Sequence, residues 1–168
     1  MMAMAQPKPG LRPFLPADTP LLAEIFRASV EELTADDYAD GQREAWAATA
    51  DDLEAFAERL GSQLTLLGTL GGSPVGFASL KDGNCIDMLY VHPAAAGQGV
   101  GALLIDAIEK LAAARGANKL IAEVSDTALP FFKQHGFVEW RRNTVPLGNE
   151  WLANTTMEKT LAATKGSP

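Results

Sequence analysis

The sequence predicts an α+β fold with a mixed, mostly antiparallel sheet. Apolar residues recur at helical spacing in the first third of the chain and again near its middle. Short runs of strand-forming residues lie between and after these segments, separated by turn-forming residues. One long helical segment connects two of the runs, Cys85–Val91 and Leu120–Ser125. This order predicts two parallel strands joined by a right-handed crossover.

The first third of the chain is predicted to hold one short strand, Leu11–Phe14, followed by three helices. The first helix begins at Asp18-Thr19-Pro20, where the aspartate is expected to cap it and proline suits the first turn. An acidic, turn-like segment, Thr34–Gly41, comes next. Two short helices, Arg43–Ala50 and Asp51–Leu60, complete this part.

Three strands are predicted in the middle of the chain, over Leu64–Leu70, Val75–Leu80 and Cys85–Val91. The two connections carry strong turn residues, Gly71-Gly72-Ser73-Pro74 and Asp82-Gly83-Asn84. Both connections are short, so the three strands are expected to be antiparallel neighbours.

The longest helix follows, with apolar residues at helical spacing from Val100 to Leu111 and a stop at Arg115-Gly116. The strand Leu120–Ser125 comes next. A short helix and a final pair of strands close the fold, over Thr127–Gln134, Phe137–Val145 and Trp151–Lys159.

The chain of 168 residues has the size of one domain, and no linker divides it. We assign residues 11–160 to this domain and residues 1–10 and 161–168 to terminal tails. The N-terminus lacks the apolar core of a signal peptide, and no apolar run approaches the ~20 residues of a membrane span. The sequence therefore predicts a cytoplasmic protein that does not bind membranes.

The composition argues against an intrachain disulfide, a metal site and nucleic-acid binding. With a single cysteine, Cys85, no intrachain disulfide can form. Because there are only two histidines, His92 and His135, no metal site is expected. A net charge of −7 opposes the phosphate contacts on which nucleic-acid binding depends. A homodimer is compatible with this composition.

A glycine-rich loop before the long helix is the most informative segment. Gly97, Gly99 and Gly101 occupy alternate positions, which allows a tight turn with inward-pointing N–H groups. The positive end of the helix dipole adds to these donors, so the loop is a candidate pyrophosphate site. It has neither the G-x-G-x-x-G spacing of a dinucleotide fold nor the G-K-[ST] of a P-loop.

The loop resembles the cofactor loop of the GNAT superfamily of N-acetyltransferases, which reads [QR]-x-x-G-x-[GA] after a V-x-P strand end. Here the strand ends in Val91-His92-Pro93, and Gly99 and Gly101 match the two glycine positions. Gln98 stands where arginine or glutamine is common in the family, and Ala96 departs from its [QR] position. A side-chain contact is lost at Ala96, but a cradle of backbone N–H groups does not need it.

A second motif downstream is similar to the N-x-x-A-x-x-x-Y-x-x-x-G-F of the same family. Ala128, Gly136 and Phe137 match it, whereas Ser125 replaces its asparagine and Phe132 its tyrosine. The resemblance extends over nearly the whole chain. The Phe-Phe variant of the motif, together with segments 36–46 and 151–159, resembles a bacterial subgroup related to the YafP-type acetyltransferases.

The resemblance implies that the two parallel strands splay apart, that helices cover both faces of the sheet, and that acetyl-CoA is the co-substrate. Backbone groups of the first strand would pair with the pantetheine arm like an added strand, and one N–H near Leu89 or Tyr90 would stabilise the thioester oxygen. The residues implied in cofactor binding are Leu89, Tyr90, Val91, Ala96, Gly97, Gln98, Gly99, Val100, Gly101, Ala102, Ser125, Phe131 and Phe132.

Three residues are candidates for catalysis. Glu123 lies within a strand beside the splayed gap, where partial desolvation is expected to suit a general base. Asp87, in the neighbouring strand, is the alternative base. Phe132 cannot donate the proton that the family's tyrosine gives to the leaving thiolate, so Tyr90 is the candidate donor, with Tyr38 or water as alternatives.

The predicted reaction is the direct transfer of an acetyl group from acetyl-CoA to a primary amine of a small molecule or peptide. Tyr38 and Trp46 are implied in the acceptor pocket. Two alternatives stay open. One is a non-catalytic acyl-CoA-binding sensor, which Phe132 would suit, and the other is a nucleotide-binding protein built on the glycine loop.

Overall fold

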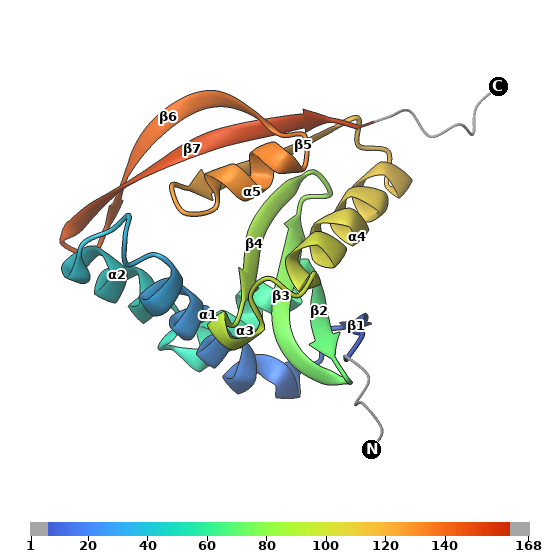
Figure 1. The fold of residues 1–168 in the computed structure, drawn as a ribbon, viewed down its shortest axis with the longest axis horizontal. Coiled ribbons are helices and arrows are strands. Elements are labelled where there is room, and N and C mark those ends of the chain that lie inside the picture. The colour runs from blue at the N-terminus through green and yellow to red at the C-terminus, as the bar shows by residue number, and fades with distance from the viewer. Residues whose placement is uncertain (1–6, 162–168) are drawn as a thin grey trace, which may run out of the picture.

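The sheet has seven strands in the order β1-β2-β3-β4-β5-β7-β6 (Figure 1). The computed structural model describes residues 7–161, so residues 1–6 and 162–168 of the two expected tails lie outside the described residues. The strands are β1 (Pro9–Pro13), β2 (Leu64–Leu70), β3 (Ser73–Lys81), β4 (Cys85–Val91), β5 (Lys119–Ser125), β6 (Val138–Leu147) and β7 (Glu150–Thr160). Neighbouring strands are antiparallel except β4 and β5, which confirms the predicted α+β fold and its parallel pair.

Helices cover both faces of the sheet, as expected. They are α1 (Thr19–Leu33), α2 (Asp40–Ala47), α3 (Leu53–Gly61), α4 (Val100–Ala114) and α5 (Leu129–Gln134). On one face, Phe26 of α1 and Phe56 of α3 pack on Phe77 in a buried cluster. On the other face, Leu104 of α4 and Phe132 of α5 belong to a second buried cluster. In the described part of the chain, no helix combines the length and apolarity of a membrane crossing.

The start of α1 differs from the prediction in one respect. Asp18 is the N-cap residue of α1, but its side chain makes no capping hydrogen bond with the helix. Its carboxylate instead accepts a hydrogen bond from the Leu15 N–H at 2.8 Å and two from the Arg12 guanidinium at 2.7 and 2.9 Å. The prediction of a capping aspartate was therefore wrong, because a cationic partner on β1 competes for the same oxygens.

Other helix starts also differ from the sequence prediction, namely those of α2, α3 and α5. Helix α2 begins at Asp40 rather than Arg43, because the Gln42 side chain accepts a hydrogen bond from the Ala39 N–H at 2.8 Å. Helix α5 begins at Leu129 rather than Thr127.

A β-bulge at Asp87 changes the direction of β4. Ser79 on β3 pairs with Met88, but Leu80 pairs with Ile86, which leaves Asp87 as the extra residue. As a result, Ile86 packs in the α4 cluster whereas Met88 packs in the α1 and α3 cluster. The bulge bends the strand where β4 leaves β5.

The parallel pair β4 and β5 separates after a short region of contact. Their pairing comprises Cys85 with Ile121 and Ile86 with Ala122. Beyond these pairs, β5 stays paired with β7 as far as Ser125. The edge of β4 after the bulge therefore faces a gap, which confirms the splayed pair.

Candidate active site

Three cavities that share lining residues lie in and beside the gap between β4 and β5. Their volumes are about 390 Å³ on the side of the β6–β7 hairpin, about 210 Å³ towards α4 and α5, and about 70 Å³ between the strands. Trp46, Tyr90 and Ser125 line all three. A molecule that occupies the gap can therefore be approached from both faces of the sheet.

Backbone N–H groups of the glycine loop form a row of hydrogen-bond donors at the start of α4. Gly97 and Gly99 have φ angles of 79° and 86°, in the left-handed region that favours glycine. The first helical hydrogen bond here runs from Leu103 N–H to the Gly99 carbonyl. Within residues 7–161, the N–H groups from Gly97 to Ala102 donate to no backbone or side-chain acceptor. This row of free donors at a helix N-terminus suits a pyrophosphate.

The other loop residues from the sequence prediction lie around this row. Ala96, Gln98 and Ala102 are exposed, whereas Val100 is buried. Val100 packs so closely on β2 that a Cβ added at Gly68 would lie 2.6 Å from one of its methyl groups. Val100 therefore anchors the helix start to the sheet, and the exposed residues form the rim.

The 210 Å³ cavity is lined mainly by apolar side chains, including Leu89, Val91, Phe131 and Phe132. At Gly101, a Cβ would lie 3.4 Å from the Phe131 ring, so glycine keeps this wall open. The structure thus brings the end of β4, the start of α4 and helix α5 around one apolar channel.

Asp87 and Glu123 both line the 390 Å³ cavity, from opposite sides of the gap. Glu123 is exposed, not partly desolvated as the sequence suggested. Among the described residues it forms no hydrogen bond or ion pair. Asp87 is half-buried, and its Oδ2 accepts hydrogen bonds from Arg59 Nε and Gln63 Nε2, each at 2.8 Å. Burial acts to raise the pKa of Asp87, but the bonds from Arg59 and Gln63 outweigh it and leave that pKa below its usual value.

Tyr90 belongs to a cluster of aromatic rings at the centre of the gap. Its ring lies 4.6 Å from that of Phe26, 5.7 Å from Phe77 and 6.5 Å from Trp46, centroid to centroid. Burial raises the pKa of Tyr90 to about 12, so its hydroxyl is protonated at neutral pH. Trp46 also packs edge-on against Tyr38, at 5.4 Å.

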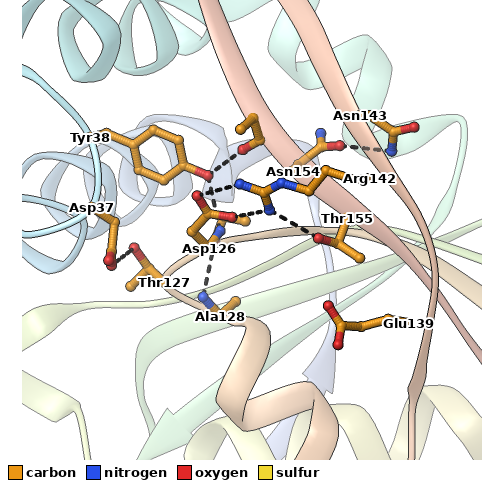
Figure 2. Close-up of polar contacts among 12 residues, drawn as sticks. Asp37, Tyr38, Asp126, Thr127, Ala128, Glu139, Arg142, Asn143, Asn154 and Thr155 are labelled. Atoms are coloured by element: carbon orange, nitrogen blue, oxygen red, sulfur yellow. Dashed lines mark hydrogen bonds and ion pairs between the residues drawn. The ribbon is translucent and has the colours of Figure 1, made fainter.

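The Tyr38 hydroxyl joins the segment before α2 to the other half of the sheet (Figure 2). It donates a hydrogen bond to the Ala153 carbonyl of β7 at 2.6 Å and accepts one from the Asp126 N–H at 2.9 Å. The Asp126 carboxylate in turn pairs with the Arg142 guanidinium of β6 through both oxygens. The single proton of the Tyr38 hydroxyl is therefore already engaged, and this residue holds a wall of the 390 Å³ cavity in place.

Sequence reasoning missed several residues of this region. Arg59 and Lys81 line the 390 Å³ cavity, together with Asn154 of β7. Asp126 and Arg142 brace its wall. No local motif marks Arg59, Lys81, Asn154 or Arg142. Asp126 was the exception, because it directly follows Ser125 within the second motif.

Comparison with known proteins identifies this arrangement. A family model described as an acetyltransferase (GNAT) domain matches residues 34–161. The chain belongs to the GNAT acetyltransferase family. This confirms the predicted family, the fold and the class of acetyl-CoA-dependent N-acetyltransferases, and it favours an enzyme over the two alternatives.

Individual GNAT proteins resemble the chain along most of its length. The uncharacterized N-acetyltransferase YafP of Escherichia coli is 29% identical over 88% of this chain and 93% of its own. The crystal structure of a GCN5-related N-acetyltransferase from Rhodopseudomonas palustris is 57% identical, with a TM-score of 0.91 over 95% of this chain and 100% of that one. PaiA N-acetyltransferase of Thermoplasma acidophilum, solved with coenzyme A, shares the fold at 19% identity, with a TM-score of 0.76 over 91% of this chain and 99% of that one.

Proposed function

We propose that the protein transfers the acetyl group of acetyl-CoA directly to a primary amine held in the 390 Å³ cavity. The observation that carries this proposal is the meeting of two cavities of different character at one gap. The cavity towards α4 and α5 is apolar, whereas the cavity on the other face holds two carboxylates. A thioester in the gap would be open to an amine from the opposite face.

The residues present fit acetyl-CoA. The free N–H row from Gly97 to Ala102 would hold the pyrophosphate, and the apolar channel beside Phe131 would take the pantetheine arm. Within residues 7–161, no strand pairs with the edge of β4 after Asp87 on the side of the gap, so its backbone groups would pair with the pantetheine amides. Acetyl-CoA supplies the activated acyl group, and the chain supplies binding and orientation.

Glu123 is the stronger candidate for the general base. Its carboxylate is free among the described residues, whereas Asp87 is held by Arg59 and Gln63. The lowered pKa of Asp87 also makes it a weak proton acceptor at neutral pH. Glu123 would take a proton from the bound ammonium group, directly or through one water. The neutral amine nitrogen then forms a bond to the acetyl carbon as the carbon–sulfur bond breaks.

The role of Tyr90 follows from its pKa of about 12. A thiol has a pKa of roughly 8.5, so moving the phenolic proton to the leaving sulfur would cost about 4–5 kcal/mol. Tyr90 is better suited to donate a hydrogen bond than to give up its proton. The nitrogen would lose its second proton as the amide forms, and the sulfur would gain a proton through water, so the two transfers balance. Phe132 would serve as an apolar wall beside the pantetheine.

Thiol release and mass spectrometry of the product test the proposal. Purified protein is mixed with acetyl-CoA and a panel of primary amines, and each acetylated product is identified by its mass. We expect N-acetylated product and free coenzyme A in equal amounts. Binding of coenzyme A without turnover of any amine would instead support a sensor.

A thermal-shift comparison tests the cofactor separately from turnover. Coenzyme A and acetyl-CoA are expected to raise the melting temperature, because a ligand at ~100 Kd adds about 2.7 kcal/mol of stability. ATP is expected to have no such effect. Equal shifts with all three ligands, or none with coenzyme A, would contradict the assignment of the glycine loop.

A further inference from the structure

We propose that the acceptor is a small zwitterion, an amine that also carries a carboxylate, such as an amino acid. In this assignment Glu123 receives the ammonium group and Lys81 binds the carboxylate. The inference rests on the proposed function and adds to it the chemical class of the acceptor.

Four charged side chains line the 390 Å³ cavity, two cationic and two anionic: Arg59, Lys81, Asp87 and Glu123. Arg59 and Asp87 neutralise each other through an ion pair of 2.8 Å. Glu123 and Lys81 have no ion-pair partner among the described residues. The cavity therefore presents one unpaired negative charge and one unpaired positive charge to its occupant.

The register of the sheet places Lys81 and Glu123 at different positions along the gap between β4 and β5. Lys81 pairs with Cys85, and Cys85 pairs with Ile121, so these three residues lie in a row where β4 and β5 still touch. Glu123 is two residues further along β5, towards the open part of the gap. Two residues of a strand span roughly 7 Å, and the two strand spacings from β3 to β5 add roughly 10 Å sideways, so the backbones of Lys81 and Glu123 lie roughly 12 Å apart. Both side chains line the cavity and are long and flexible, so their charged ends can come within the length of a small amino acid. This spacing suits the two charged ends of a small amino acid.

Of the two unpaired charges, the negative one is nearer to the place where the thioester would lie, as acetyl transfer to the ammonium end of the acceptor requires. Glu123 lies on the side of Tyr90 and Ser125, the residues shared by all three cavities, so the ammonium group would be next to the thioester. Lys81, which is exposed, lies at the opposite end, where β4 and β5 are still paired. The aromatic rings of Trp46 and Tyr38 line the same cavity and would contact the carbon chain between the two charges.

The balance of charge argues against an acceptor that is only cationic. A diamine would bring a second positive charge into a cavity that already holds Lys81, and a lysine side chain would bring a positive charge with no carboxylate for Lys81 to bind. Like charges oppose binding. A cavity selected for such cations would be expected to carry a net negative charge. A volume of about 390 Å³ is also within the range of small-molecule sites.

Matched acceptors provide the test. Initial rates with acetyl-CoA are measured for β-alanine, γ-aminobutyrate and 5-aminovalerate, and for ethylamine, propylamine and butylamine, which lack only the carboxylate. Several α-amino acids are included beside their decarboxylated amines. We expect the best amino acid to exceed its matched amine at least tenfold in kcat/KM.

Variants of Lys81 assign the effect to this residue. Lys81→Met is expected to raise KM for the best amino acid about tenfold, with kcat nearly unchanged and the matched amine unaffected. Lys81→Glu is expected to shift the preference towards a diamine of similar length, such as 1,4-diaminobutane beside γ-aminobutyrate. Lys110→Met, which removes an exposed lysine of α4 far from the cavity, is the control for the loss of one charge.

Each outcome decides between the two proposals. Equal rates for amino acids and matched amines, or an equal effect of Lys81→Met on both, would overturn the zwitterion while acetyl transfer to amines stands. A preference for diamines in the unaltered protein would overturn it as well. Failure to acetylate any primary amine in the presence of bound acetyl-CoA would remove the proposed function itself, and the zwitterion with it.

Discussion

At the scale of the residue, Asp87 and Glu123 show how surroundings assign different roles to similar groups. Both are carboxylates on strands that border the gap, yet one is fixed by Arg59 and Gln63 and the other is free among the described residues. A fixed carboxylate with a lowered pKa is suited to hold a neighbour in place. A free carboxylate beside the gap is suited to exchange protons with an acceptor.

The first prediction concerns Glu123. Glu123→Gln keeps the shape of the side chain and removes its basicity, so kcat is expected to fall by about 10²–10⁴-fold. The affinity for acetyl-CoA, measured by calorimetry, is expected to stay nearly unchanged. Asp87→Asn is the comparison: if it abolishes turnover while Glu123→Gln remains active, Asp87 is the base.

Asp87 carries a second prediction, for stability against pH. Its pKa is lower in the folded protein than the usual value of about 3.9, so the contribution of the Arg59 pair is fully present above that value. The contribution is lost as the pH falls through the lowered pKa of the folded state. We therefore expect the melting temperature of Asp87→Asn to decline less steeply below about pH 4 than that of the unaltered protein.

An exposed aspartate without an ion pair in the described structure, such as Asp36, provides the matched control for this experiment. At neutral pH, Asp87→Asn is expected to cost about 1–2 kcal/mol, because a partly buried charged hydrogen bond is lost. Parallel acid limbs for Asp87→Asn and the unaltered protein would show that the pair does not stabilise the fold.

At the scale of the element, helix α4 connects the glycine loop to the core. Its start is fixed by Val100, which packs against Gly68 of β2, and its N-cap is Gly99 in the left-handed region. Its buried face, which includes Leu104 and Ile108, packs on the sheet. The free donors of the loop are thus held by the same packing that stabilises the domain.

The third prediction compares the two ends of this helix. Gly99 and Gly116 have φ angles of 86° and 90°, so valine at either position is strained by about 1–3 kcal/mol. Each such loss lowers the melting temperature by roughly 2–4 °C per kcal/mol in a chain of this size. Only Gly99→Val is expected to weaken acetyl-CoA binding as well, by more than tenfold, because its side chain would meet the pyrophosphate. Equal acetyl-CoA affinity in both variants would contradict the assigned site.

At the scale of the whole molecule, contacts across the gap hold its two sides together. The hairpin of β6 and β7 extends past α5 towards α2, and Tyr38, Asp126 and Arg142 connect it to the segment before α2 (Figures 1 and 2). Strands β4 and β5 share only two residue pairs, so these distant contacts compensate for the lost pairing. They also form a wall of the 390 Å³ cavity.

The fourth prediction tests this connection. Tyr38→Phe leaves the Ala153 carbonyl and the Asp126 N–H without their partner, and is expected to cost about 1–3 kcal/mol in the free energy of unfolding by urea. The KM of the amine is expected to rise more than the dissociation constant of acetyl-CoA, because β7 borders the acceptor side. A variant with unchanged stability and unchanged KM would show that the hydroxyl braces nothing.

Much of the element order was predictable, because it depends on residues close together in the chain. The ranges of β2 and β4 agree with the prediction, and Gly71 and Gly83, both with positive φ, lie in the turns that bound these strands. The glycine loop was recognisable for the same reason. Its donors and the helix dipole arise from a few consecutive residues, whatever the rest of the chain does.

Only the tertiary structure decided what each side chain does in the site. The bulge at Asp87 depends on how β4 pairs with β3, and Arg59 reaches Asp87 from a separate helix. Tyr38 is hydrogen-bonded to Ala153, which is 115 residues away in the sequence. Such contacts have no local signature, because any polar residue of suitable reach would look the same in the sequence. By itself the sequence determined the order of elements, the family and the glycine loop, whereas the pairing of distant charges, and with it the character of the 390 Å³ cavity, came from folding.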